Sequence, residues 1–229
     1  VNSYFESSQA DLGSIAGSCS GAVTIDSVYS NAIVNGANSR TGGMIGAGFG
    51  KTTVQYCWYA GTVTQTTTNY RFTGGILGAA YDSSTATITN CLNTGTISSS
   101  ATSNKVYVAG ILGRVGSSST MEMNGCLNIG EVTANNSEYS YVSVNALIGA
   151  VTGANSVTVQ NCYAQTDSAK RLYEDWTGAN KVTATDVRFV DEENLEGIKG
   201  YQKTALDFTS YWAAIENKTP QLLSFTDKK

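Results

Sequence analysis

The chain has 229 residues, a formal net charge of −4 and no histidine. Without a cluster of Lys and Arg, the composition argues against binding of nucleic acid or of an anionic membrane surface. No apolar run approaches the roughly 18 residues that a bilayer span requires, so we expect no membrane insertion. The 24 Gly and single Pro, with abundant Ser and Thr, favour extended structure over helix.

Five related segments follow one another along the chain. Each has a glycine anchor, and the anchors are Gly17, Gly46, Gly78, Gly113 and Gly149. The last four segments also share a cysteine, and these are Cys57, Cys91, Cys126 and Cys162, spaced by 34, 35 and 36 residues. Val28 takes this place in the first segment. A recurring period of this length is typical of a repeat architecture.

Within each segment, apolar and polar residues alternate, as in Ala86-Thr87-Ile88. A period of two indicates short strands. The cysteine comes one step out of phase, which predicts a bend or bulge that keeps both flanking side chains inside. We therefore predict an all-β fold, a right-handed parallel β-helix (solenoid) of about five coils over residues 1–170. A small α/irregular cap over residues 171–229 is expected to close it.

The recurring cysteines are predicted to form a structural ladder. Stacked residues lie about 4.8 Å apart with parallel Cβ vectors, so their Cβ atoms stand beyond the usual disulfide distance. Metal ligands must converge on a point, whereas these side chains form a line that also includes a valine. We expect reduced, buried thiols at Cys57, Cys91, Cys126 and Cys162, while Cys19 lies outside the column.

A second row of residues is apolar, although strict alternation predicts that its side chains point outward. It lies two residues before each glycine anchor and consists of Ile15, Met44, Ile76, Ile111 and Leu147. An exposed apolar strip is a liability for the monomer that we expect. Either the tail buries the strip, through Leu195, Ile198, Phe208 or Trp212, or the strip is an interface with another domain or a partner.

From residue 171 the composition changes, because charge rises and the alternation ends. Asp191, ahead of two glutamates, predicts a helix over about 191–199. An open solenoid end exposes strand edges and core, and therefore needs a cap. We interpret four large side chains as covering the last coil, with a sugar-stacking platform as the alternative; they are Trp176, Phe208, Trp212 and Leu222.

We predict no catalytic residue, no cofactor and no metal site. The absence of histidine removes the commonest general base and any Ser-His or Cys-His pair. The acids within the coils are few, namely Asp11, Asp26, Asp82, Glu122, Glu131, Glu138 and Asp167. Of these, Asp26 and Glu122 are out of register and cannot form a glycosidase pair. Ice binding through a threonine row is disfavoured because Glu122 interrupts the row.

Two recurring blocks resemble a known family. They are “GGILG” at 74–78 with “CLNTG” at 91–95, and “GILG” at 110–113 with “CLNIG” at 126–130. The pattern is similar to the GLUG repeat and extends over about residues 11–170. The stretch “EENLEG” and then “LDFTSYWAAIENKTPQLL” looks like a closing segment common in such proteins, with matching places at Asp207, Phe208, Trp212, Pro220 and Leu222.

The resemblance implies a module of a bacterial cell-surface or secreted protein, as in adhesin-like proteins and the accessory region of immunoglobulin A proteases. Adhesion, other binding or a spacer role would follow, with a host protein, a glycan or neighbouring domains as partner. The alternative is a carbohydrate-binding or carbohydrate-active β-helix of the polysaccharide lyase or glycosidase kind. Because the chain opens within polar sequence and has no leader, we expect it to be part of a longer secreted precursor.

Overall fold

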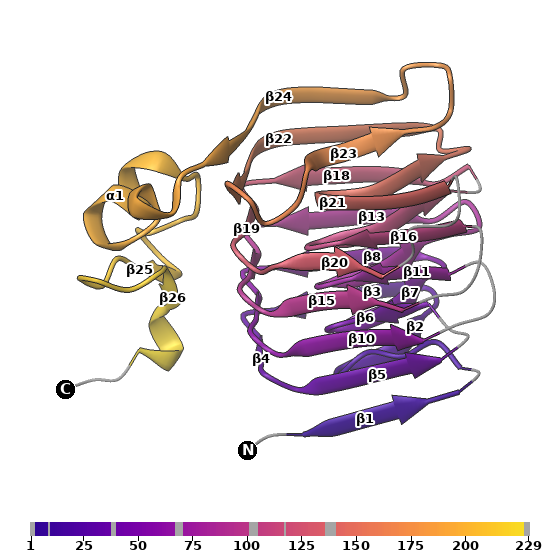
Figure 1. Cartoon of the computed structure of the whole chain (residues 1–229), viewed down its shortest axis with the longest axis horizontal. Coiled ribbons are helices and arrows are strands. Elements are labelled where there is room, and N and C mark those ends of the chain that lie inside the picture. The colour runs from indigo at the N-terminus through magenta and orange to yellow at the C-terminus, as the bar shows by residue number, and fades with distance from the viewer. Residues whose placement is uncertain are drawn as a thin grey trace.

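The computed structural model describes residues 3–8, 10–37, 40–66, 71–100, 105–116, 118–135 and 141–226. Over these residues the fold is all-β apart from short helices, and three parallel sheets, here called A, B and C, curl round a common axis (Figure 1). Each of the five repeats contributes strands to all three sheets, and the next repeat stacks on it. This arrangement is compatible with the predicted parallel β-helix.

Sheet A contains β1 (Tyr4–Ser7), β5 (Ile33–Ala37), β10 (Thr62–Thr66), β15 (Thr96–Ser99) and β20 (Val132–Ala134). Its strands pair in parallel and in register, so that each interior side chain lies on the equivalent one of the previous repeat. Val63, for example, pairs with Val34 on one side and with Ile97 on the other. All three are fully buried.

Sheet B contains β2 (Ala16–Cys19), β6 (Thr41–Gly42), β7 (Ile45–Gly48), β11 (Arg71–Gly74), β12 (Leu77–Ala80), β16 (Lys105–Ala109), β17 (Leu112–Gly116), β21 (Tyr141–Thr152) and β23 (Arg171–Asp175). Repeats two to four cross this sheet as two strands with a bend between them. In the fifth repeat, where Asn145-Ala146 replaces the paired glycines, the single long strand β21 covers both halves.

Sheet C contains β3 (Ala22–Asp26), β4 (Tyr29–Ser30), β8 (Lys51–Gln55), β9 (Trp58–Tyr59), β13 (Thr85–Thr89), β14 (Leu92–Asn93), β18 (Thr120–Asn124), β19 (Leu127–Asn128), β22 (Ser156–Gln165) and β24 (Val182–Val190). The bend predicted at the cysteine is confirmed. The residue before the cysteine column has a positive φ in every repeat, at Ser27, Tyr56, Asn90, Gly125, Asn161 and Asp186. This turn brings the cysteine inside together with the apolar residue three positions earlier.

The bend in sheet B has a different geometry. The backbone N–H groups of Ile76 and Leu77 both donate to the carbonyl of Ile111, each at 3.0 Å. Two consecutive residues therefore meet one residue of the next repeat, as in a bulge, and both side chains point inward. Gly75 is required at this bend, because a Cβ there would stand 2.1 Å from the carbonyl oxygen of Gly110.

The glycine block and the Cys-x-Asn block meet in the interior. A Cβ at Gly110 would lie 2.1 Å from Oδ1 of Asn128. Asn128 is fully buried, and it accepts a hydrogen bond at 2.7 Å from the side-chain amide of Asn93 in the previous repeat. Each asparagine also bonds to the glycine two residues later, as in the 3.1 Å bond from Gly95 N–H to Asn93 Oδ1. The two recurring blocks thus form one interior column.

Other repeats have different side chains at the positions of Gly110 and Asn128. The first repeat has Ser14 and Ser30, whose hydroxyl oxygens share a hydrogen bond at 2.8 Å. The fifth has two fully buried alanines, Ala146 and Ala164. A glycine therefore accompanies a large partner and an alanine accompanies a small one, which keeps the packed volume similar.

Parallel pairing continues beyond residue 170, which corrects the expectation that the alternation ends there. β23 pairs with β21, and β24 pairs with β22 over eight residue pairs. In the second pairing Val187 lies beside Cys162, so it occupies the cysteine column. The repeats therefore extend in part to Val190, and the closing segment begins near Asp191 rather than at residue 171.

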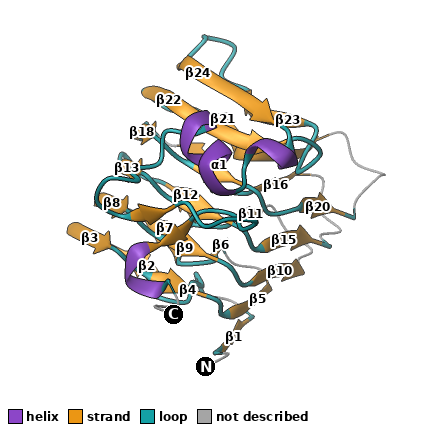
Figure 2. Ribbon diagram, turned by 90° about the vertical axis from the view of Figure 1, so that its left-hand side faces the viewer, coloured by secondary structure: helices purple, strands orange, loops and turns teal. Residues whose placement is uncertain are grey.

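The closing segment holds η1 (Glu192–Asn194), α1 (Gly197–Lys203), β25 (Trp212–Ala213), β26 (Gln221–Leu222) and η2 (Leu223–Phe225). The predicted helix over 191–199 is wrong in its bounds, because the chain forms a 3-10 turn before α1 begins at Gly197. Asp191 makes no side-chain cap; its carboxylate instead accepts a hydrogen bond from Thr166. The segment packs along the flank of the stack (Figures 1 and 2).

Candidate functional site

An open pocket of about 610 Å³ lies at the end of the stack where the chain finishes its repeats. It is bounded by β20 and β21 on one side, and by residues 167–171 and Glu174 on the other. We call this the terminal pocket. Sheets B and C each carry one further strand at this level, β23 and β24, whereas sheet A ends at β20.

A shortened connection creates the terminal pocket. Asn128 and Ala164 occupy equivalent positions, and so do Asn145 and Arg171. The chain covers 17 positions from Asn128 to Asn145 but only seven from Ala164 to Arg171. The final turn is therefore ten residues shorter, and the strand that would have continued sheet A is missing. This difference in spacing was the sequence signal that could have predicted the pocket.

The interior side of the terminal pocket is apolar. Val142 and Val144 follow Val106 and Val108 in register, yet the earlier pair is fully buried while the later pair is half-buried. Val132 and Ala134 of β20 and Ala169 complete this side. Residues that belong to the core by their position are thus partly exposed, because no strand among the described residues lies above them.

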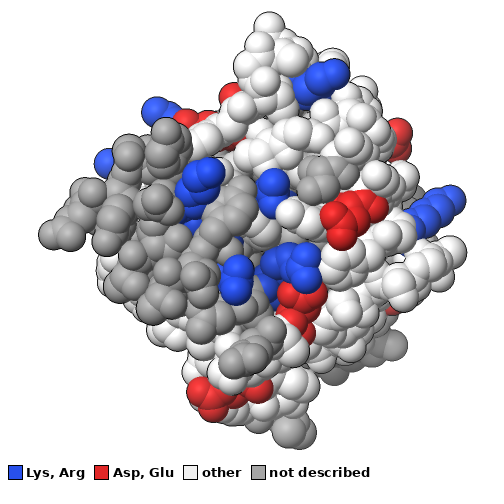
Figure 3. All heavy atoms as spheres, turned by 90° about the vertical axis from the view of Figure 1, so that its right-hand side faces the viewer, with Lys and Arg blue, Asp and Glu red and all other residues white. Residues whose placement is uncertain are grey.

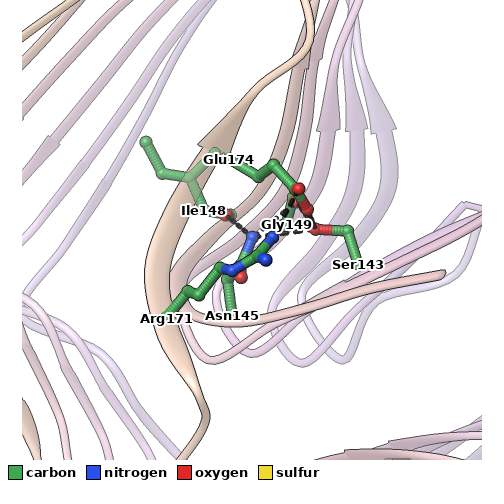
Figure 4. Close-up of polar contacts among 6 residues, drawn as sticks. All are labelled: Ser143, Asn145, Ile148, Gly149, Arg171 and Glu174. Carbon is green, nitrogen blue, oxygen red and sulfur yellow. Dashed lines mark hydrogen bonds and ion pairs between the residues drawn. The ribbon is translucent and has the colours of Figure 1, made fainter. Parts of the chain in front are cut away.

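A hydrogen-bonded cluster forms the wall between β21 and β23 (Figure 4). The buried amide of Asn145 donates to the carbonyls of Ile148 and Gly149, at 2.9 and 2.8 Å. Ser143 lies 2.6 Å from one carboxylate oxygen of Glu174, to which its hydroxyl can donate, and Arg171 contacts the other oxygen at 2.5 Å. Both carboxylate oxygens of Glu174 are therefore engaged, so this cluster holds β23 in place.

The rim carries charges of both signs. Four exposed charged side chains lie along it, namely Glu131, Asp167, Lys170 and Arg171. Glu131 and Asp167 are two of the few acids counted in the coils from the sequence, and the fold brings both to this pocket. The terminal pocket therefore combines an apolar interior with charged groups at its rim, as ligand sites commonly do.

The structure places all four ladder cysteines in one column. Cys57, Cys91, Cys126 and Cys162 are completely buried and unpaired, and Val28 lies half-buried at the start of the column. Their thiols donate to backbone carbonyls, as Cys91 does to Thr89 at 3.4 Å. Burial raises the pKa of the Cys91 and Cys162 thiols well above the usual value. Cys19, at the end of β2, is also buried and free.

The apolar strip predicted on the surface lies in the core. Met44, Ile76, Ile111 and Leu147 are fully buried among the interior side chains, and Ile15 alone is largely exposed, at 46%. The prediction assumed strict alternation, but the bulge at the glycine bend turns two consecutive side chains inward. Ile15 stays exposed because no earlier repeat covers it, so the strip is not an available interface.

The tail instead covers the row of residues that directly follows the cysteine column. This row consists of Tyr29, Trp58, Leu92, Leu127 and Tyr163. Leu195, Leu206, Trp212 and Leu222 pack against it, with Phe208 at the edge. The predicted role of Trp212, Phe208 and Leu222 as a cover is therefore right in kind, although they cover the flank of sheet C and not the open end of the stack.

Arginines and aromatic rings alternate on the outer side of sheet B. The Arg114 guanidinium lies 4.6 Å from the ring centroid of Phe72 and 4.9 Å from that of Tyr81, and Arg40 lies over Tyr81 at 5.4 Å. Trp176 packs edge-on against Tyr107 in the same cluster, away from the tail. These contacts are of the cation–π kind. Sequence periodicity gave no sign of this cluster, because it combines outward residues within strands with residues from loops; the former are Phe72, Tyr107 and Arg114, and the latter are Arg40, Tyr81 and Trp176.

On the flank of the stack opposite the tail, acidic and basic side chains are interspersed (Figure 3). Among the described residues, no three His, Cys, Asp or Glu side chains are grouped so as to hold a metal ion. No helix in the described part of the chain has the length and apolar character of a membrane span. Glu138, one of the acids considered from the sequence, lies outside the described residues.

Comparison of the chain with protein-family models, with curated proteins and with solved structures gives no match in any of the three.

Proposed function

We propose that the chain is a non-catalytic, GLUG-type repeat module of a bacterial cell-surface or secreted protein, and that it acts in adhesion or other binding, or as a spacer. In this account it is a right-handed parallel β-helix of five coils with an incomplete sixth turn. The handedness follows from the strong preference of parallel crossovers. The resemblance of the “GGILG” and “CLNTG” blocks to that repeat supports the assignment.

The observation that carries this proposal is where the recurring side chains lie. Gly110, Asn128 and the cysteine column are interior, and their contacts join one repeat to the next. A chain that repeats its interior contacts builds an elongated body whose outer faces are free to vary. The outward row of sheet C does vary, with Glu122 among threonines. Such faces suit a binding or spacing role.

A carbohydrate-active module is the second candidate, because three carboxylates and two basic side chains line the terminal pocket. Glycoside hydrolysis requires two carboxylates with separate roles. Glu174 is already bound through both oxygens, which leaves Glu131 and Asp167 as the pair to test. Both side chains are exposed, whereas the general acid of a glycosidase lies in an apolar pocket.

The test is to apply the purified chain to a glycan array, to a panel of host extracellular proteins and to a panel of polysaccharides. Saturable binding to one ligand class, without cleavage, is the result expected of an adhesion module, and no binding is expected of a spacer. Release of reducing ends or unsaturated sugars would contradict the proposal. Such activity should then be lost in E131Q and D167N but kept in E6Q, which changes an exposed acid at the far end of sheet A.

A further inference from the structure

The apolar core of the stack is incompletely covered at both of its ends. Most of the partly buried apolar side chains that pack against the main core belong to the first repeat or to the last turn, residues 166–190; they are Phe5, Leu12, Ala16, Val23 and Val28 at one end, and Ala169, Leu172, Tyr173, Val182, Val187 and Phe189 at the other. The equivalent residues of the middle repeats are fully buried, as Val34 is in the column of Phe5. Among the described residues, both ends therefore leave interior surface open.

At the first end, the edge strand β3 has backbone groups without a strand to bond. The N–H of Lys51 in β8 donates to the carbonyl of Gly21 at 2.7 Å. Alternate residues of a parallel strand bond to opposite neighbours, so Val23 also bonds toward β8. The N–H and C=O groups of Ala22 and Thr24 consequently face the open edge of sheet C.

At the last end, β24 has open backbone groups with the opposite orientation. The N–H of Val157 in β22 donates to the carbonyl of Lys181 at 2.9 Å, so Lys181 and Thr183 bond to β22. The backbone groups of Val182 and Ala184 therefore face away from the stack. An open sheet edge of this kind is a template for another strand.

We propose that the chain associates head to tail with a second copy of itself, so that the first repeat of one copy stacks on the last turn of the other. The open backbone groups fit in the register that the column already has, with the partner's Val23 over Val182. The N–H of Val182 then meets the carbonyl of the partner's Ala22, and the N–H of the partner's Thr24 meets the carbonyl of Val182. This goes beyond the proposed function, since it gives the ends of the stack a partner of their own.

The same register matches a large side chain with a small one in sheet A. The N–H of Val132 donates to the carbonyl of Ser168 at 2.9 Å, which places Ala169 over Val132. Val132 ends the interior column that begins at Phe5. The partner's Phe5 would therefore stack on Ala169, where a small side chain leaves room for an aromatic ring.

Two further columns are complementary in size and in charge. In sheet C the column that begins at Ile25 ends at Ala184, so a large side chain again meets a small one. In sheet A the residues after Phe5 and Ala169 are Glu6 and Lys170, and both are exposed. Stacked strands lie about 4.8 Å apart, which brings the partner's Glu6 within reach of Lys170.

The connections at the two ends are compatible with this contact. Residues 176–181 join β23 to β24 and rise beyond β24 at the corner of the stack (Figure 1). The corner that would face them is the shortest possible match, because residues 20–21 alone join β2 to β3. The closing segment lies beside the stack and does not extend past β24 or β1 (Figures 1 and 2), so it leaves both ends accessible.

The experiment is sedimentation velocity of the full chain between about 1 µM and about 1 mM. A head-to-tail contact does not close, so the average mass should rise steadily with concentration from a dilute monomer, with a Kd between about 50 µM and 1 mM. A chain that stays monomeric at about 1 mM, or that stops at a closed dimer, would overturn the proposal.

Proline variants test the polarity of the contact. T24P and A184P each remove an N–H at an open edge, where proline is tolerated, and each blocks one end. Neither variant alone should self-associate, with affinity at least tenfold weaker, but their mixture should form a one-to-one dimer and nothing longer. Self-association of either variant alone, or a mixture that stays monomeric, would contradict head-to-tail stacking. Circular dichroism and thermal unfolding establish that both variants fold.

A charge exchange at exposed positions tests the register independently of these backbone changes. E6K and K170E should each weaken association by about 2–5-fold, in line with an exposed ion pair, and the double variant E6K/K170E should restore it. E122K, at an exposed acid in the middle of sheet C, is the matched control and should change nothing. A double variant no better than the single ones would refute the register. Because the glycan and host-protein screen uses dilute chain and other ligands, its failure and the failure of self-association are separate results.

Discussion

The backbone N–H of Cys126 donates to the sulfur of Cys162, the equivalent cysteine of the next repeat, across 3.4 Å. Successive thiols thus face one another as packing groups within a fully buried column. Reagents should therefore not reach them in the native protein. Titration with a thiol reagent should find almost none of the five cysteines before unfolding and all five afterwards. A disulfide among the four column members, or rapid native labelling of any of them, would refute the ladder.

Stability should fall at alkaline pH. Burial raises the pKa of Cys91 and Cys162 in the folded chain, whereas hydrogen bonds within the column lower the pKa of Cys57 and Cys126. Burial acts on the whole column and disfavours every thiolate, so we expect the thiols to ionise first in the unfolded chain, near their usual value of about 8.5. Their contribution is therefore complete below that pH and is lost as pH rises toward the folded pKa. Denaturant titrations across this range should show the decline, and C91V should make it shallower.

C91V is a suitable control because valine already holds the column at Val28 and Val187. At neutral pH the exchange should cost less than about 1.5 kcal/mol, as for other swaps of similar volume. A loss of several kcal/mol would mean that the sulfur has a specific role that packing does not explain.

The closing segment should protect the row that follows the cysteines. Trp212 is 1% exposed and packs over Leu92 and Leu127. W212A should lower the free energy of unfolding by about 3–5 kcal/mol and should increase binding of a hydrophobic dye. L223A, at a side chain that is 40% exposed, is the matched control and should change neither measurement. A dye-silent, stable W212A would mean that the segment does not depend on this contact.

Hydrogen exchange should be fastest before about residue 35 and slowest over residues 75–130. Among the described residues, the strands of the first repeat are edge strands, and Ile15 is 46% exposed where the equivalent Met44 is fully buried. Local opening is easiest where few buried apolar contacts resist it. Uniform protection along the chain would contradict this gradient.

The repeats themselves could be predicted because Gly78 and Cys91 recur with their neighbours at a near-constant spacing. The direction of Ile76 could not be obtained from alternation, since both Ile76 and Leu77 donate to one carbonyl at the bend and both turn inward. The same reasoning had succeeded at the cysteine, where the change of phase was visible in the pattern. At the glycine bend both neighbours are apolar, and the change of phase leaves no trace in the sequence.

The candidate site was missed for a different reason. Ser143 and Glu174 belong to two turns of the chain, and their contact depends on the shortened connection that places β23 beside β21. The short spacing between Ala164 and Arg171 is present in the sequence. The incomplete sixth turn was missed because the composition changes after residue 170. The remaining signal in the sequence was Val187, which continues the cysteine column. In the structure it follows Asp186, whose φ is positive like that of the other residues before the column.

The central claim is that the two recurring blocks encode one interior column, and a double-mutant cycle at Gly110 and Asn128 tests it most directly. G110A should destabilise the chain by about 1–3 kcal/mol, because its Cβ would stand 2.1 Å from Asn128 Oδ1 and 2.5 Å from the backbone carbonyl oxygen of Ala146. N128A should also destabilise, through lost hydrogen bonds. The double variant removes the clash with Asn128 and leaves the contact with the Ala146 carbonyl, so its loss should be smaller than the sum of the single losses by about 0.5–3 kcal/mol. Strictly additive losses would show that the two blocks act independently and would contradict the account.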